Sequence, residues 1–281
     1  MGNVAAELFR QAASLDRNGP LRKGNVVHIP SEREVILTGD FHGNRMNFTR
    51  TLSYAGLDAH PERILLLQEI IHGPLDERTG VDRSIELLMR AARLKVSKPG
   101  QIVFLLGNHD VAQVTGNEIT KQGMGSCEQF DKGVKYNYPD DWQEVQTALN
   151  EFLLSLPLAA RTPGGMFMAH SMPSPKRMHL GGTEIFDRPY QDQDLRRGGP
   201  VYEWTWGRGQ TEEQTAELAR ELDVEFFLLG HRHVASGWEL VTDRALTLAS
   251  DHGQGCLMRF GSDETLTAET VEAHTHRILS L

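Results

Sequence analysis

The sequence predicts a layered α/β fold, because short apolar runs of strand length alternate with longer amphipathic segments along most of the chain. The apolar runs lack the in-out alternation of a half-exposed strand and therefore predict strands buried on both faces. They lie at residues 34–38, 63–67, 101–106, 165–169 and 225–229. Apolar residues at helical spacing predict helices at residues 3–15, 44–56, 81–95, 142–155 and 211–222.

Two other regions differ from this alternation. Residues 238–241, 245–249 and 256–260 are short runs separated by turns, which predict an antiparallel meander. Residues 171–210 are rich in Pro and Gly with little periodicity, and a segment of that kind and length is usually functional, so we expect it to cover an active site. No repeat or low-complexity linker divides the sequence. We therefore expect one domain over residues 1–281, in which residues 1–30 form an N-terminal helix and lead-in.

Composition restricts the partners and the compartment. The 281 residues carry a formal net charge of −9 and no run of Lys or Arg, which argues against a nucleic-acid backbone as the main partner. No segment approaches the roughly 18 apolar residues of a membrane span. The two cysteines form no CxxC pair, which favours a reducing compartment. We expect a soluble, cytoplasmic protein that binds no nucleic acid and no membrane. The net charge still allows a small phosphorylated substrate, which needs only a local cationic pocket.

Side chains of metal-ligand type follow each of the five predicted strands. They are Asp40 and His42, then Gln68 and Glu69, then Asn108, His109 and Asp110, then His170, and finally His231 and His233. Open α/β sheets bind ligands at the carboxyl ends of their strands, so these side chains are expected to converge. One such motif alone is more often a turn, but five in succession indicate a metal site. Carboxylate, imidazole and amide donors suit Mn, Fe, Zn or Ni, and a pair of such ions suits the hydrolysis of a phosphate ester.

The order of these blocks resembles the calcineurin-like metallophosphoesterase superfamily over residues 34–260. Within the superfamily it is most similar to the branch of phosphoprotein phosphatases and diadenosine tetraphosphatases, and residues 152–158 resemble that branch's approach to a metal histidine. The resemblance implies a four-layer fold, a β-sandwich flanked by helices, with the metal site at strand carboxyl ends. It also implies that metal-bound hydroxide hydrolyses a phosphomonoester of a phosphoprotein or of a nucleotide type.

The resemblance also implies a role for each block. One metal ion would be bound by Asp40, His42 and His233, and a second by Asn108, His170 and His231. The catalytic residues would be His109, as the acid that protonates the leaving-group oxygen, and Asp110 beside it.

The middle block departs from the family pattern. Aligning its Gly-Pro pair puts Gln68 at the Asp that bridges the two ions, Ile71 at an Asp that orients the catalytic His, and His72 at a phosphate-binding Arg. An amide offers one neutral oxygen where a carboxylate offers two anionic ones. We expect Gln68 to ligate one ion through that oxygen. Two alternatives are that Glu69 turns inward to bridge, which needs a bulge, or that only one ion is bound tightly.

The substrate-binding residues expected from these positions are His72, Asn108 and Arg208. Arg208 lies in the segment 171–210, and its guanidinium would replace the missing phosphate clamp. Two rival functions remain open: a degenerate phosphatase fold that binds a ligand or a protein without turnover, and a hydrolase of dinucleoside polyphosphates.

Overall fold

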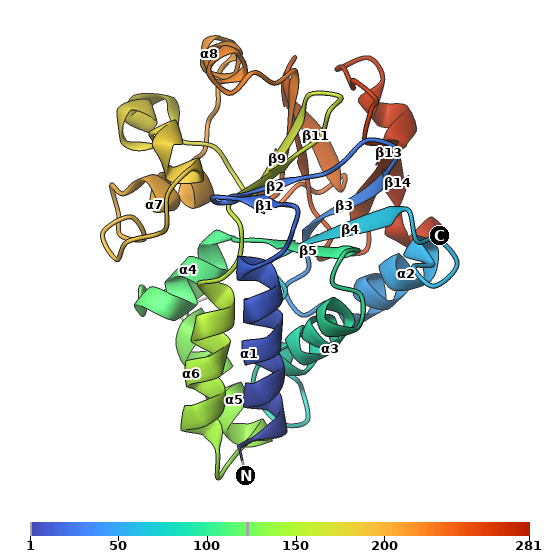
Figure 1. Ribbon diagram of the computed structural model, residues 1–281. Helices are drawn as coiled ribbons and strands as arrows, with labels where there is room; N and C mark the ends of the chain where they lie inside the picture. Colours follow the sequence, from blue (N-terminus) through green and yellow to red (C-terminus); the bar gives the residue numbers. More distant parts are fainter. Residues whose placement is uncertain (1, 122–123) are drawn as a thin grey trace.

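Two β-sheets pack face to face in the computed structural model of the chain, which describes residues 2–121 and 124–281, and helices flank the sheets (Figure 1). This arrangement confirms the predicted α/β class and the sandwich flanked by helices. No helix in the described part of the chain is both long and apolar enough to cross a membrane.

The five-stranded sheet has the order β14-β13-β3-β4-β5. Its parallel half consists of β3 (Glu34–Asp40), β4 (Arg63–Gln68) and β5 (Ile102–Leu105). The antiparallel edge consists of β13 (Cys256–Gly261) and β14 (Thr275–Arg277). The three parallel strands are the first three that the sequence predicts.

The seven-stranded sheet has the order β1-β2-β8-β9-β10-β12-β11. In chain order these are β1 (Arg22–Lys23), β2 (Val26–His28), β8 (Ala159–Arg161), β9 (Met166–Ala169), β10 (Phe226–Leu229), β11 (Trp238–Thr242) and β12 (Ala245–Leu248). The predicted fourth and fifth strands, β9 and β10, lie side by side and parallel. A separate ribbon pairs β6 (Thr120–Lys121) with β7 (Met124–Gly125).

Each of the five predicted helices is present. They are α1 (Val4–Arg17), α2 (Arg45–Ala55), α3 (Ser84–Ser97), α6 (Trp142–Leu153) and α8 (Glu212–Leu222). Local signals set several ends: the Asn3 side chain caps α1, Thr211 caps α8, and Gly56 ends α2 in the left-handed conformation.

Three further helices were not predicted: α4 (Asn108–Thr115), α5 (Ser126–Asn137) and α7 (Pro200–Trp206). The first begins within a polar strand-end motif and has only eight residues, so it carries little apolar periodicity. The last lies in the segment 171–210, which also contains two short 3-10 helices. That segment is anchored rather than structureless, since the buried Trp204 donates from Nε1 to the carbonyl oxygen of Gly181 at 2.8 Å.

The predicted meander is only partly right. β11 and β12 form an antiparallel pair, but β13 leaves them and pairs with β3 in the other sheet. Apolar periodicity reports which face of a strand is buried, and both sheets bury the same kind of face, so the pattern does not identify the neighbouring strand.

The strands alternate between two apolar layers. Val35 and Leu37 face the space between the sheets, where Ile64 and Leu66 of β4 join them. The residues between them face the helices, as Ile36 does. A strand buried on both faces has no polar side, which explains the continuous apolar runs in the sequence.

The site-bearing strand ends meet where the two sheets approach each other. Asp40 is in register with Gln68, and an isolated bridge joins Asp40 to Ala249 after β12 of the other sheet. A Cβ on Gly39 would lie 2.2 Å from the carbonyl oxygen of Leu248, so this approach requires glycine.

Candidate metal centre and active site

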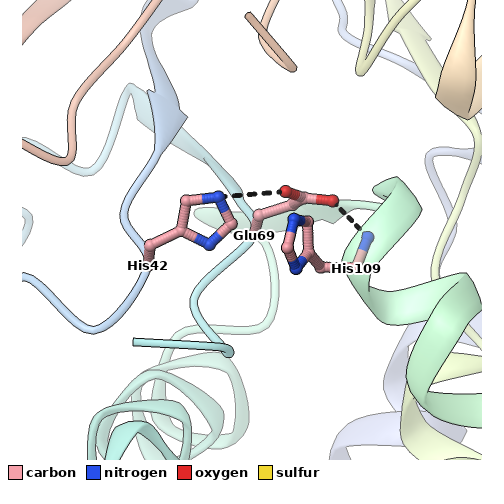
Figure 2. A group of neighbouring side chains, drawn as sticks. All are labelled: His42, Glu69 and His109. Atoms are coloured by element: carbon pink, nitrogen blue, oxygen red, sulfur yellow. Dashed lines mark hydrogen bonds and ion pairs between the residues drawn. The ribbon is translucent and has the colours of Figure 1, made fainter. Parts of the chain in front are cut away.

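Glu69 lies at the middle of the site, directly after β4. Its φ of 32° is in the left-handed region, which few non-glycine residues adopt. The carboxylate is fully buried, and Oε1 accepts a hydrogen bond from the backbone N–H of His109 at 2.6 Å (Figure 2). A Cβ on Gly107 would lie 2.3 Å from the Glu69 side chain, so the glycine of the third motif leaves room for this carboxylate.

A first cluster of ligand-type atoms consists of His42, Glu69 and His109, whose ligand atoms all lie within 4.8 Å of one another (Figure 2). Nε2 of His42 is 3.5 Å from Oε2 of Glu69, and Nδ1 is 3.0 Å from the carbonyl oxygen of Ile71. Because a carbonyl oxygen only accepts, Nδ1 of a neutral His42 carries the proton and Nε2 offers its lone pair to the cluster.

A second cluster consists of Asp40, Glu69 and His170. Nε2 of His170 lies 3.3 Å from Oε1 of Glu69, 2.9 Å from Oδ1 of Asn108 and 3.2 Å from Nδ1 of His231. Glu69 therefore belongs to both clusters. The structure brings together most of the predicted ligands, and it places a carboxylate between two groups of donors.

Burial keeps the inner histidines neutral. Desolvation lowers the pKa of His170 well below its usual value, and the neighbouring His231, His42 and Arg208 lower it further. Desolvation and then Arg208 lower the pKa of His231 to about 3. Neutral imidazole is the form that binds metal ions, so both side chains are in the ligand state at neutral pH.

The Gln68 side chain lies at the edge of the second cluster, and its role as a ligand stays a prediction. Its Nε2 donates to the carbonyl oxygen of Thr38 at 3.0 Å, and its Oε1 lies 3.1 Å from Nδ1 of His170. The amide thus orients His170, whereas the neighbouring Glu69 faces the centre. The side chain of Glu69 faces the centre, as in the alternative in which Glu69 turns inward. A positive φ produces the turn, and the strand irregularity lies in β3.

The two histidines after β10 lie in different surroundings. His231 is buried and its Nδ1 lies 2.7 Å from Oδ1 of Asn108, whereas His233 is exposed. The structure groups His233 with Asp251 and His252 rather than with either cluster around Glu69. The ring of His233 lies 5.1 Å from that of His252. Its expected place beside Asp40 and His42 stays a prediction.

His72 and Asp110 are engaged inside the protein. Nδ1 of His72 lies 2.7 Å from Nδ1 of His109, and Nε2 lies 2.9 Å from Oε1 of Gln113. This placement suits a residue that orients His109 better than one that binds phosphate. Burial raises the pKa of Asp110 to about 7, and its carboxyl oxygen accepts from the N–H of Gly107 at the start of α4.

Two residues near His72 and His109 were absent from the sequence prediction, and a third residue of the site, Glu69, was named there only as an alternative. Glu69 was considered only as an alternative, because neighbouring strand residues normally face opposite sides. Nothing in the sequence pattern points to Gln113 or Asp131, which lie in helices that were not predicted.

The segment 171–210 borders the centre on one side. Nε of Arg208 donates to Nε2 of His231 at 3.0 Å, and the ring of Trp206 lies 6.4 Å from that of His231. A cavity of about 240 Å³ opens here, lined in part by Arg177, Arg197, Trp206 and Arg208. It shares Arg197 and Trp206 with a second cavity of about 740 Å³.

Comparisons with known proteins identify the family. A sequence profile described as calcineurin-like phosphoesterase matches residues 34–235. A serine/threonine-protein phosphatase of Caenorhabditis elegans is 24% identical over 225 residues, which are 75% of this chain and 46% of that relative. The chain thus spans about half the length of the curated relative that it matches.

Solved structures share the fold. A protein serine/threonine phosphatase from Saccharomyces cerevisiae, with similarity to human phosphatase PP5, superposes with a TM-score of 0.66 at 18% identity, covering 91% of this chain and 81% of that one. A cold-active protein-tyrosine phosphatase of a psychrophilic Shewanella species gives a TM-score of 0.62 at 14% identity, covering 89% and 80%. At these identities the likeness shows a common architecture.

Proposed function

The chain belongs to the calcineurin-like phosphoesterase family, and from this premise we propose that it is a metal-dependent phosphatase that hydrolyses phosphomonoesters on proteins. The relatives named as protein phosphatases support the substrate class. The observation that carries the proposal is the place of Glu69, whose buried carboxylate belongs to two clusters of ligand-type side chains.

The donor set fits two metal ions. Asp40 and Glu69 are both buried and contribute to one cluster, where two like charges destabilise each other unless cations offset them. Glu69 would be shared between the ions. Asp40 and His42 would complete one site, and Asn108, His170 and His231 the other. These nitrogen and oxygen donors suit Mn, Fe, Zn or Ni.

Bound ions would supply Lewis-acid charge neutralisation at the phosphoryl oxygens and would acidify water. Side chains of the protein would bind the phosphoryl group and supply the proton. Nε of Arg208 donates to Nε2 of His231, and the guanidinium would form a charge-assisted hydrogen bond to a phosphoryl oxygen. His109 would give a proton from Nε2 to the leaving-group oxygen. The polypeptide around the phosphorylated residue would lie along the cavities beside Trp206.

The experiment is a parallel measurement of metal content and turnover. Purified protein would be dialysed and analysed for metal by mass spectrometry, and then assayed with p-nitrophenyl phosphate and a phosphoserine peptide with and without Mn²⁺. We expect about two ions per chain and hydrolysis that His109→Ala lowers about 10²–10⁴-fold. A metal-free protein with no turnover above that variant would instead identify a binding module without activity.

A further inference from the structure

We propose that Gln113 and Asp131 are positioning residues that act through His72 to hold a proton on Nδ1 of His109. The side chains form one hydrogen-bonded relay that leads from the centre to helix α5. The geometry of the relay stands on its own, and its catalytic consequence rests on the proposed function.

The relay has three contacts of hydrogen-bond length. Nδ1 of His109 lies 2.7 Å from Nδ1 of His72. Nε2 of His72 lies 2.9 Å from Oε1 of Gln113, and Nε2 of Gln113 donates to Oδ1 of Asp131 at 2.8 Å. His109 and Gln113 are one turn apart on α4, and Asp131 lies on α5. His72, His109 and Gln113 are buried, so water does not easily replace these bonds.

The carboxylate at the outer end decides the direction of every bond. An ionised Asp131 only accepts, so Gln113 must turn its NH₂ group outward and its oxygen toward His72. That oxygen also only accepts, and Nε2 of His72 must therefore carry a proton. A neutral His72 then has an unprotonated Nδ1, which accepts from Nδ1–H of His109. The resting proton of His109 lies on Nδ1. Under the proposed function, Nε2 takes up a second proton from solvent, and the resulting imidazolium gives that proton to the leaving-group oxygen.

Hydrogen-bond donation in the opposite direction, from His72 to His109, is unfavourable at the Asp131 end of the relay. If Nδ1 of His72 donated to His109, Nε2 of a neutral His72 would need a donor, and Gln113 would have to turn its NH₂ group inward. Its oxygen would then face an oxygen of Asp131, with no proton between them. An acceptor facing an acceptor at 2.8 Å is unfavourable, so the relay has one direction while Asp131 is ionised.

The relay supplies a partner for Nδ1 of His109 in place of the orienting Asp that the family resemblance implies. Ile71 stands where the family resemblance places an Asp that orients the catalytic histidine, and its side chain is fully buried among apolar residues. His72 occupies that role one residue later, with a φ of 61° that turns it toward His109. Its ring packs edge-on against Phe130, 5.6 Å between centroids, which restricts its rotation.

Two variants test the direction of the bonds while preserving shape. Asp131→Asn puts an amide at the outer end, which can donate as well as accept, so Gln113 can turn either way. The double variant Gln113→Glu/Asp131→Asn restores the order, because a carboxylate at 113 accepts from His72 and the amide at 131 donates to it. Glu128→Gln, an exposed acid on the same helix, is the matched control.

The first readout is independent of activity. In the full chain labelled with ¹⁵N-histidine, with zinc added and at pH 8, ¹⁵N chemical shifts distinguish an Nδ1-bound from an Nε2-bound proton. The His109 signals are assigned from their loss in His109→Gln. We expect an Nδ1-bound proton in the wild type, in Glu128→Gln and in the double variant. We expect a mixture of both tautomers in Asp131→Asn.

The second readout is the dependence on the leaving group. Phenyl phosphate needs a proton on its leaving oxygen more than p-nitrophenyl phosphate does. Asp131→Asn should therefore lower kcat for phenyl phosphate about tenfold and for p-nitrophenyl phosphate by less, with KM unchanged. The double variant should recover most of the loss, which a merely structural contribution of Asp131 would not predict.

Different results would overturn the relay and the assignment of the protein as a phosphatase. An Nε2-bound proton on His109 of the wild type, or an Asp131→Asn spectrum that equals that of the wild type, would overturn the relay whatever the activity. Equal losses on both phosphates that the double variant does not rescue would also overturn it. An inactive wild type with the expected spectra would overturn the enzyme assignment and leave the relay intact.

Discussion

The buried centre and the segment 171–210 that borders it are built in opposite ways. Side chains of the centre follow strand ends of two sheets, and Asp40, Glu69 and His170 are all buried. The bordering segment has short helices and irregular chain, and its contribution to the centre is the exposed Arg208. Under the proposed function, the strand ends would hold the metal ions, and the segment would contact the substrate.

His231 is where the two regions meet. On one side its Nδ1 contacts Asn108, and on the other its Nε2 accepts from Arg208. If the division between the regions is right, changes in the centre lower metal content, and changes in the bordering segment lower substrate binding with the metal retained.

The largest effect is expected at Glu69. Glu69→Gln removes a negative charge from between two groups of donors but keeps the size of the side chain. We expect the loss of tightly bound metal and a fall in kcat of about 10³-fold. Metal analysis after dialysis and steady-state kinetics measure both. A variant that keeps its full metal content would contradict the central place of this residue.

A smaller effect on metal affinity is expected for changes at Gln68, although Gln68 is adjacent to Glu69 in the sequence. Gln68→Ala removes one of the two neighbours of His170 Nδ1, the other being Oδ1 of Asp40 at 3.5 Å, and the loss of such a supporting bond lowers metal affinity about 10–100-fold. Gln68→Asp should not raise metal affinity, since the side chain contacts Thr38 and the Nδ1 side of the His170 ring, whereas Nε2 of that ring faces Glu69. Isothermal titration with Mn²⁺ measures each variant, and a large gain in Gln68→Asp would place this side chain between the ions.

Arg208 tests the bordering segment. Arg208→Ala should lower kcat/KM for a phosphopeptide about 10–100-fold, because it removes a charge-assisted hydrogen bond to the phosphoryl group. Metal content should not change. Lys176→Ala, an exposed cation of the same segment that lines neither cavity, is the control with an expected change below about twofold. Loss of metal in Arg208→Ala would mean that the two regions are not separable.

The smallest effect is a pH dependence of stability. The pKa of buried His231 is lowered to about 3, against an ordinary value of 6.5, so the unfolded chain gains a proton before the folded one does. In metal-free protein this contribution to stability is present above pH 6.5 and decreases as the pH falls toward 3.

The measurement is urea unfolding at pH 7.5 and pH 5, for the wild type and His231→Gln. We expect the wild type to lose up to about 2 kcal/mol more than the variant over this range. The difference between the two proteins cancels the opposite contribution of Asp110, whose raised pKa acts on both. Equal losses in both proteins would show that His231 is not held neutral by burial.

The sequence predicted the five strands that end at the centre and most of the side chains that gather there. Each buried strand has apolar residues on both faces, and a polar ligand type follows its end, so β3, β4, β5, β9 and β10 and the approach of His170 to Asn108 could be anticipated. Periodicity did not identify the partner of β13, because both sheets bury similar faces.

The details that decide the chemistry depended on backbone angles and on contacts between distant helices. The inward turn of Glu69 comes from a positive φ, which the pattern of apolar and polar residues does not predict. The relay through Gln113 and Asp131 joins two helices that were not predicted from the sequence. The exposure of His233 and its place beside His252 also could not be anticipated from its motif, and its role as a ligand stays a prediction.

The most direct measurement is anomalous diffraction from crystals of the full chain soaked in Mn²⁺. We predict two anomalous peaks, one on each side of the Glu69 carboxylate, with Asp40 and His42 near one and Asn108, His170 and His231 near the other. Peaks that contact Gln68 while Glu69 faces away, or a single peak among His233, Asp251 and His252, would contradict a centre organised by Glu69.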